Sequence, residues 1–94
     1  MTILPEAEAD LVNARNWYER QRDGLGAAFL LAVEEIFERI VRTPDAHTVV
    51  YQEVRRALTR RFPYAIYYRI EAGEAVVLGV FHAGRDPREW QSRA

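Results

Sequence analysis

Apolar residues in the first half of the chain recur every three or four positions, which is the spacing of one helical face. A first helix is expected over residues 5–22, because Pro5 suits a first helical position and the acids after it favour the positive end of the helix dipole. Its buried face is expected to consist of Ala7, Leu11, Ala14 and Tyr18. The break at "RDGLG" predicts a reversal into a second, opposed helix, so that the two form a hairpin.

A second helix is expected over residues 25–42, where the apolar face is wide. One stripe consists of Phe29, Val33, Ile36 and Ile40, and the next of Leu30, Phe37 and Val41. A face of this width predicts contacts with both the first helix and a sheet. Pro44 ends the helix because it disfavours helical geometry at Thr43.

The second half of the chain is rich in Tyr, Ile and Val, which favour strands. Strands are expected in "VRRALTRR" (54–61), "YAIYYRI" (64–70) and "AVVLGVFH" (75–82), and the turn "EAGE" predicts that the last two pair antiparallel. Side chains alternate across a strand. In the middle strand, the residues expected to face the helices are Ile66, Tyr68 and Ile70, with Ala65, Tyr67 and Arg69 on the other side. In the last strand, one face is expected to hold Val76, Leu78, Val80 and His82, and the other Val77, Gly79 and Phe81.

One sheet face must cover the helices, and the other is only partly polar, so we expect something else to cover it. "DPREW" predicts the start of a short helix with Asp86 as its cap. Trp17 and Trp90 are expected to be packing residues. The predicted fold is α+β: an N-terminal helical hairpin packed on a C-terminal antiparallel sheet of three to four strands, with a short C-terminal helix, in one domain spanning residues 1–94.

Composition narrows the class of protein. The chain of 94 residues is 49% apolar, which is ordinary for a globular domain. It has no cysteine, which excludes a disulfide framework and a thiolate zinc site and fits a reducing cytoplasm. No apolar run approaches the roughly 20 residues of a membrane span, and the N-terminus does not read as a signal peptide. A cytoplasmic protein is expected.

The net charge of −1 conceals an asymmetry. Residues 1–53 carry five arginines against ten acids, whereas residues 54–94 carry eight arginines against four acids, and the chain contains no lysine. Arginine binds carboxylates and phosphates through a planar fork, so the basic half is expected to meet an acidic partner or the acidic half of the same chain.

These features together resemble the ParE/RelE superfamily of toxins from bacterial type II toxin–antitoxin systems. The resemblance lies in the ordered set "EAEADLVNARNWYERQ", "VRRALTRRFPYAIYYRI" and "VLGVFHAGRDPREW", which extends from about Glu6 to Trp90. It implies a small toxin that an antitoxin, encoded beside it, holds inactive in a hetero-oligomer. RelE-like members cut mRNA on the ribosome, and ParE-like members inhibit DNA gyrase. A third possibility is a degenerate, non-toxic module that only binds a partner.

The residues favour the ParE-like branch. RelE-like nucleases typically carry an arginine where this chain has Tyr64 in "FPYAIYY", and they tend to be strongly basic, whereas this chain has a pI of about 6.1. Their C-terminal catalytic Tyr or His falls near His82. His82 is therefore the one catalytic candidate for a metal-independent endoribonuclease, and the alternative is a hydrogen-bonding residue at a strand end. No metal ligands and no cofactor are expected.

The candidate residues for binding the antitoxin or the target are basic and aromatic. Arginines can grip an acidic segment, and Tyr67 shares a strand face with Arg69. The alternative is a solvated edge strand protected by its charges. The residues predicted to bind are Arg55, Arg56, Arg60, Arg61, Tyr67, Arg69 and Arg85.

Overall fold

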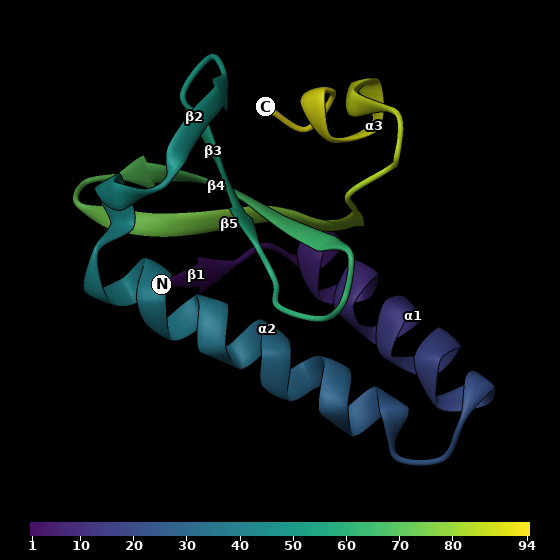
Figure 1. Ribbon diagram of the computed structural model, residues 1–94. Helices are drawn as coiled ribbons and strands as arrows, with labels where there is room; N and C mark the ends of the chain where they lie inside the picture. Colours follow the sequence, from purple (N-terminus) through teal and green to yellow (C-terminus); the bar gives the residue numbers. More distant parts are fainter.

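The computed structural model describes all 94 residues as a helical hairpin, a sheet and a short C-terminal helix (Figure 1). The predicted α+β fold is confirmed. The helices are α1 (Pro5–Gln21), α2 (Leu25–Arg42) and α3 (Pro87–Gln91), with a 3-10 turn, η1 (Pro44–Ala46), after α2. The strands are β1 (Thr2–Ile3), β2 (Thr48–Tyr51), β3 (Val54–Leu58), β4 (Tyr64–Glu71) and β5 (Glu74–His82).

The sheet has five strands in the order β1-β5-β4-β3-β2. All neighbours pair antiparallel except β1, which runs parallel to β5. The sequence predicts only three to four strands because β1 has two residues and β2 four, too few to show an alternating pattern. The first predicted strand, over residues 54–61, is too long, since β3 ends at Leu58 and both Arg60 and Arg61 lie in the following loop.

The helical hairpin packs on one face of the sheet and forms the larger core with it. Ile66 and Tyr68 of β4 point into this core, as predicted. The hydroxyl of Tyr68 donates to the carbonyl of Pro44 at 2.5 Å, so the only polar group of this buried side chain has a hydrogen-bond partner. The second predicted stripe of α2 is only partly correct, because Leu30 and Phe37 are half-buried and Val41 is 59% exposed.

The alternation predicted for β5 is wrong, because the strand contains a β-bulge. Tyr67 pairs with Gly79 and Tyr68 with Val77, so Leu78 is an extra residue on β5. The bulge shifts the pattern by one position. Val77 and Val80 therefore both face the helices, while Leu78 and Phe81 face away from them.

The other sheet face is covered in part by the chain itself. Helix α3 lies across the sheet from the hairpin (Figure 1) and buries Trp90 in a second core. The ring of Trp90 stacks on that of Tyr67 with 4.2 Å between centroids and an angle of 15° between planes. Tyr67 is consequently 2% exposed, which corrects the prediction that it lies beside Arg69 on an open surface.

Candidate functional site

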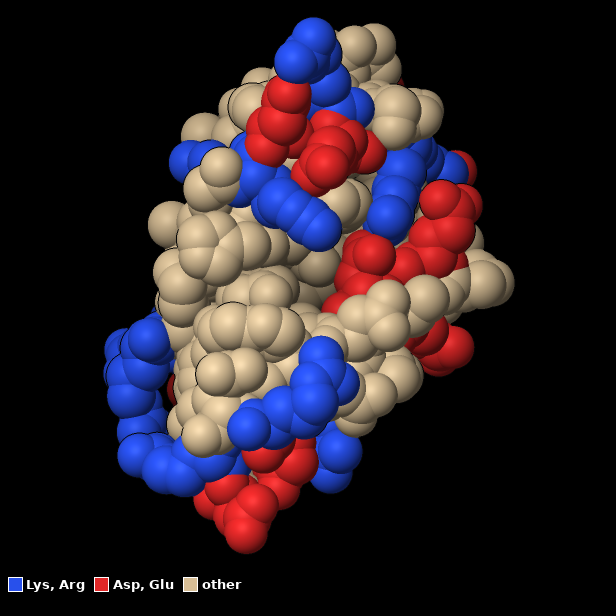
Figure 2. All heavy atoms as spheres, turned by 90° about the vertical axis from the view of Figure 1, so that its right-hand side faces the viewer, with Lys and Arg blue, Asp and Glu red and all other residues tan.

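A hollow of about 360 Å³ lies between α1, the adjoining ends of β4 and β5, and the loop after β5. Helix α1 contributes Asp10, Asn13 and Trp17, the strand ends contribute Tyr64 and His82, and the loop contributes Arg85. Figure 2 shows the corresponding side of the molecule, with uncharged surface in its middle, charged side chains of both signs above and below, and a further group of acidic side chains along one flank. The site therefore combines aromatic walls with a few polar groups, as binding pockets commonly do.

Trp17 is placed differently from the prediction. It is 49% exposed, and its ring meets one aromatic side chain, that of Tyr18, edge-on at 5.1 Å. Of the two tryptophans, only Trp90 is buried, at 5% exposure. A half-exposed tryptophan beside a hollow is typical of residues that anchor protein–protein contacts.

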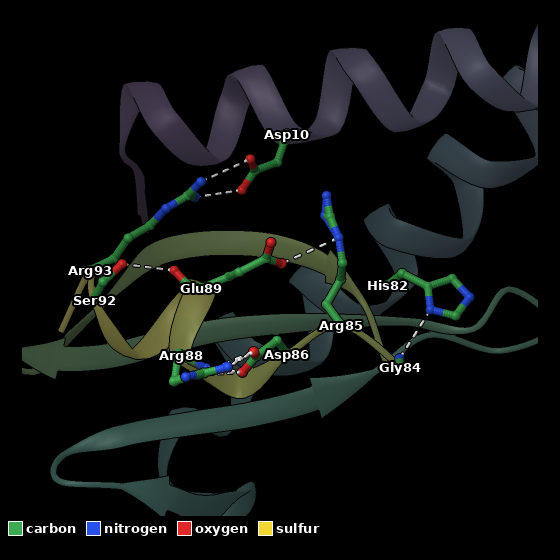
Figure 3. A network of polar contacts seen from close by, with 9 residues as sticks. All are labelled: Asp10, His82, Gly84, Arg85, Asp86, Arg88, Glu89, Ser92 and Arg93. Carbon is green, nitrogen blue, oxygen red and sulfur yellow. Dashed lines mark hydrogen bonds and ion pairs between the residues drawn. The ribbon is translucent and has the colours of Figure 1, made fainter.

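His82 is exposed at the end of β5, and its ring is held by the following turn. Its Nδ1 accepts a hydrogen bond from the backbone N–H of Gly84 at 3.0 Å (Figure 3). In the neutral ring the proton therefore sits on Nε2. The ring of His82 meets that of Tyr64 edge-on at 5.6 Å, and burial raises the pKa of the Tyr64 hydroxyl, which keeps it protonated at neutral pH.

Arg85 extends from the loop after β5 towards α1, between His82 and Glu89 (Figure 3). Its Nε lies 3.3 Å from a carboxylate oxygen of Glu89, and both side chains are about half exposed, at 51% and 49%. The guanidinium also lies 5.7 Å from the centre of the Phe81 ring. Arg85 is the one predicted binding arginine that lines this hollow.

Beside the hollow, an ion pair closes the bulge of β5 (Figure 3). Arg93 donates to Asp10 from Nη1 at 2.6 Å and from Nη2 at 3.2 Å, and Nη1 also donates to the carbonyl of Leu78 at 3.1 Å. The N–H of Val80 donates to the same Asp10 carboxylate at 3.0 Å. The hydrogen bond to Asp10 raises the pKa of Arg93. The two side chains thus satisfy backbone groups of β5 that lie beyond the end of β1.

Sequence reasoning missed this network because its two partners lie 83 positions apart. The available signal was Gly79, since a glycine within a strand often marks a bulge. A side chain there would be crowded, because a Cβ on Gly79 would lie 2.5 Å from the ring of Phe81 and 3.0 Å from Nη1 of Arg93.

The structure does not bring the remaining predicted arginines together. Arg55 donates to the carbonyls of Asp45 and His47, at 2.9 and 2.7 Å, and so holds the chain that enters β2. Arg69 pairs with Glu71 on its own strand at 3.4 Å. Arg61 borders a separate hollow on the acidic outer side of α2. Arg56 lies on β3 and Arg60 in the loop after it, and both side chains are exposed.

Among the groups relevant to RNA cleavage without a metal, the hollow holds His82, Tyr64 and one arginine, Arg85. Cleavage of RNA without a metal requires a base, an acid and cations for the phosphate. Here Tyr64 stays protonated and Arg85 is the only arginine in the lining. No group of three or more His, Cys, Asp or Glu side chains is placed to hold a metal ion. None of the helices is long and apolar enough to cross a bilayer.

Comparison with known families decides the class of protein. Residues 2–87 match the family described as the ParE toxin of the type II toxin–antitoxin system, parDE. The chain belongs to the ParE toxin family. Membership makes it the toxin component of a toxin–antitoxin pair, with an antitoxin protein as its partner.

A solved structure supports the same fold for this ParE-family chain. A chain of the chromosomal ParDE toxin–antitoxin system from P. aeruginosa superposes with a TM-score of 0.64 at 20% sequence identity. The similarity covers 87% of this chain and 95% of that one. No curated protein matches this sequence.

Proposed function

We propose that this ParE-family toxin arrests growth by binding and inhibiting DNA gyrase, and that an antitoxin encoded beside it neutralises it in the cytoplasm. The match to the ParE toxin family over residues 2–87 carries the proposal, because ParE-like resemblance implies gyrase as the target. The overall charge agrees with a protein target, since a protein with a pI near 6.1 has no excess of positive charge with which to bind the phosphates of RNA.

The chemistry of the hollow supports action by binding. The Nδ1 of His82 accepts a hydrogen bond in the turn, and the Tyr64 hydroxyl is a weaker acid than usual because burial raises its pKa. The same walls, with Trp17 and Arg85 at the surface, are of the residue types that dominate protein–protein contacts.

The alternative function is ribosome-dependent mRNA cleavage. One observation favours it, namely that His82, Tyr64 and Arg85 line a single hollow. His82→Gln separates the two functions. A binding toxin retains its growth arrest with this change, whereas an endonuclease that uses His82 loses activity by orders of magnitude.

The cellular test compares plasmid topology with mRNA integrity after induction. Expression without the neighbouring reading frame is expected to stop growth and to relax plasmid DNA while transcripts stay intact. Co-expression of the neighbouring protein is expected to restore both growth and supercoiling. Cleaved transcripts with normally supercoiled plasmid would support the endonuclease, and unimpaired growth would support a non-toxic binding module.

A further inference from the structure

The donors around the hollow are not used by the chain itself. The lining includes Trp17, Tyr64, His82 and Arg85, whose free donors are an indole N–H, a hydroxyl, an Nε2–H in the neutral ring and terminal amino groups. None of these groups hydrogen-bonds within the chain, since His82 accepts through Nδ1 and Arg85 meets Glu89 only through Nε. Polar groups of this kind gathered in one hollow are complementary to an acceptor with several lone pairs.

The one carboxylate in the lining is already satisfied. Asp10 accepts two hydrogen bonds from Arg93 and one from the backbone of Val80. It therefore does not compete strongly for the donors of Arg85 and His82. Its charge, and the neighbouring Glu6 and Glu89, still disfavour a polyanion such as nucleic acid, whereas a single carboxylate between Arg85 and the aromatic walls is tolerated.

The hollow opens into a second one, so a segment of a partner chain can extend from one into the other. A second hollow of about 660 Å³ adjoins it between α1 and α3, and the two share Asp10, Phe81 and Arg85 in their walls. Arg85 thus stands at the junction of the two spaces. A segment that places one side chain in the first hollow can run on past Arg85 into the second.

We propose that this hollow captures one Asp or Glu side chain from an extended segment of the antitoxin, with an adjacent apolar side chain packed on Trp17. Arg85 binds the carboxylate through its terminal amino groups, and the hydroxyl of Tyr64 donates to it. This assignment deepens the proposed function and rests on it for the identity of the partner.

The test measures binding of the purified protein to the product of the reading frame adjoining its gene, which serves as the probe. Trp17→Ala and Arg85→Ala are the test variants. Val41→Ala and Arg42→Ala on α2 are matched controls, because they remove an exposed apolar and an exposed basic side chain far from the hollow. Melting curves of all four variants identify any change caused by unfolding.

Both test variants are expected to bind at least about tenfold more weakly, as for residues that anchor an interface, and both controls within about twofold. Increased salt should reduce the penalty for Arg85→Ala more than that for Trp17→Ala. Affinities of folded test variants that equal those of the controls would overturn the proposal. So would variants that retain full affinity for the neighbouring protein but lose toxicity, because the hollow would then face the target.

Fluorescence gives a second readout of the same site. Trp17 is half exposed and Trp90 is buried, so complex formation is expected to protect Trp17 from acrylamide and to shift its emission to the blue. Trp17→Phe should abolish the change while binding persists at reduced affinity. A change that persists in Trp17→Phe, or one elicited at similar concentration by a short single-stranded RNA, contradicts the proposal.

Failure of this inference is distinguishable from failure of the proposed function. If the wild-type protein arrests growth but the hollow variants bind the neighbour normally, only the binding site is wrong. If the variants bind weakly but the wild-type protein is harmless, the site is correct and the toxin function is wrong.

Discussion

Glu19 shows how a single residue can close the helical hairpin. Its carboxylate accepts from the N–H of Gly24 at 3.0 Å and from that of Gly26 at 2.9 Å, and so caps α2 from the preceding helix. The N-cap residue of α2, Gly24, has no side chain that could supply this cap. The two backbone hydrogen bonds lower the pKa of Glu19 below its ordinary value of 4.5.

Replacement of Glu19 with Gln is expected to lower the melting temperature at neutral pH, because the charged acceptor at the positive end of α2 is lost. Since the pKa of Glu19 is lowered in the folded state, its stabilisation is complete above the unfolded value and is lost as the pH falls through the folded value. The difference in melting temperature between wild type and Glu19→Gln should therefore be largest near pH 7 and shrink towards pH 3. Glu34→Gln on the exposed side of α2 is the control, and equal differences at both pH values would contradict the account.

The residue scale also shows what the sequence can predict. Phe29, Val33, Ile36 and Ile40 are buried as predicted, because their spacing alone places them on one helical face. The cap by Glu19 was not predicted, since it depends on how the hairpin turns. Trp17 was expected to pack, and is half exposed, because the ends of β4 and β5 and the loop after β5 leave a hollow beside it.

Helix α3 depends on its packing, because a helix of five residues is not stable alone. The sequence predicts its start correctly, and the side chain of Asp86 accepts from the N–H of Arg88 at 3.0 Å. Its docking position was not predictable from periodicity. The stack of Trp90 on Tyr67 fixes that position and covers the sheet face opposite the hairpin.

Trp90→Ala is expected to destabilise the protein by about 3–5 kcal/mol, because it removes a buried ring and leaves Tyr67 uncovered. Trp17→Ala is the matched control and should cost much less, since its ring is 49% exposed. Urea unfolding of the two variants measures the difference. Similar losses would contradict the assignment of Trp90 to the core and Trp17 to the surface.

The bulge in β5 is a second feature at the level of the secondary-structure elements. It explains why the alternation of faces predicted for β5 does not hold across Leu78. Arg93→Ala is expected to cost about 1–3 kcal/mol, because it removes the charged partner of Asp10 and the side-chain donor to the carbonyl of Leu78. Arg88→Ala serves as the control, since its pair with Asp86 is at the surface, and should melt like wild type. An Arg93→Ala protein as stable as that control would show that the bulge does not need the ion pair.

At the scale of the whole molecule, the fold was largely predictable and the site was not. Hydrophobic periods and turn residues determine the order of helices and strands. The predicted arginines, by contrast, are scattered over separate surfaces, because their positions depend on the loops and on internal partners such as the carbonyls that Arg55 binds. Only His82 and Arg85 of the predicted site residues line the hollow beside Trp17.

The most direct test of the central claim is DNA supercoiling by purified gyrase in the presence of this protein, released from its antitoxin complex. Inhibition at concentrations comparable to that of gyrase, reversed by adding the antitoxin, is the expected result, and His82→Gln should inhibit equally well. Normal supercoiling by gyrase, together with cleavage of ribosome-bound mRNA by the same preparation, would contradict the account.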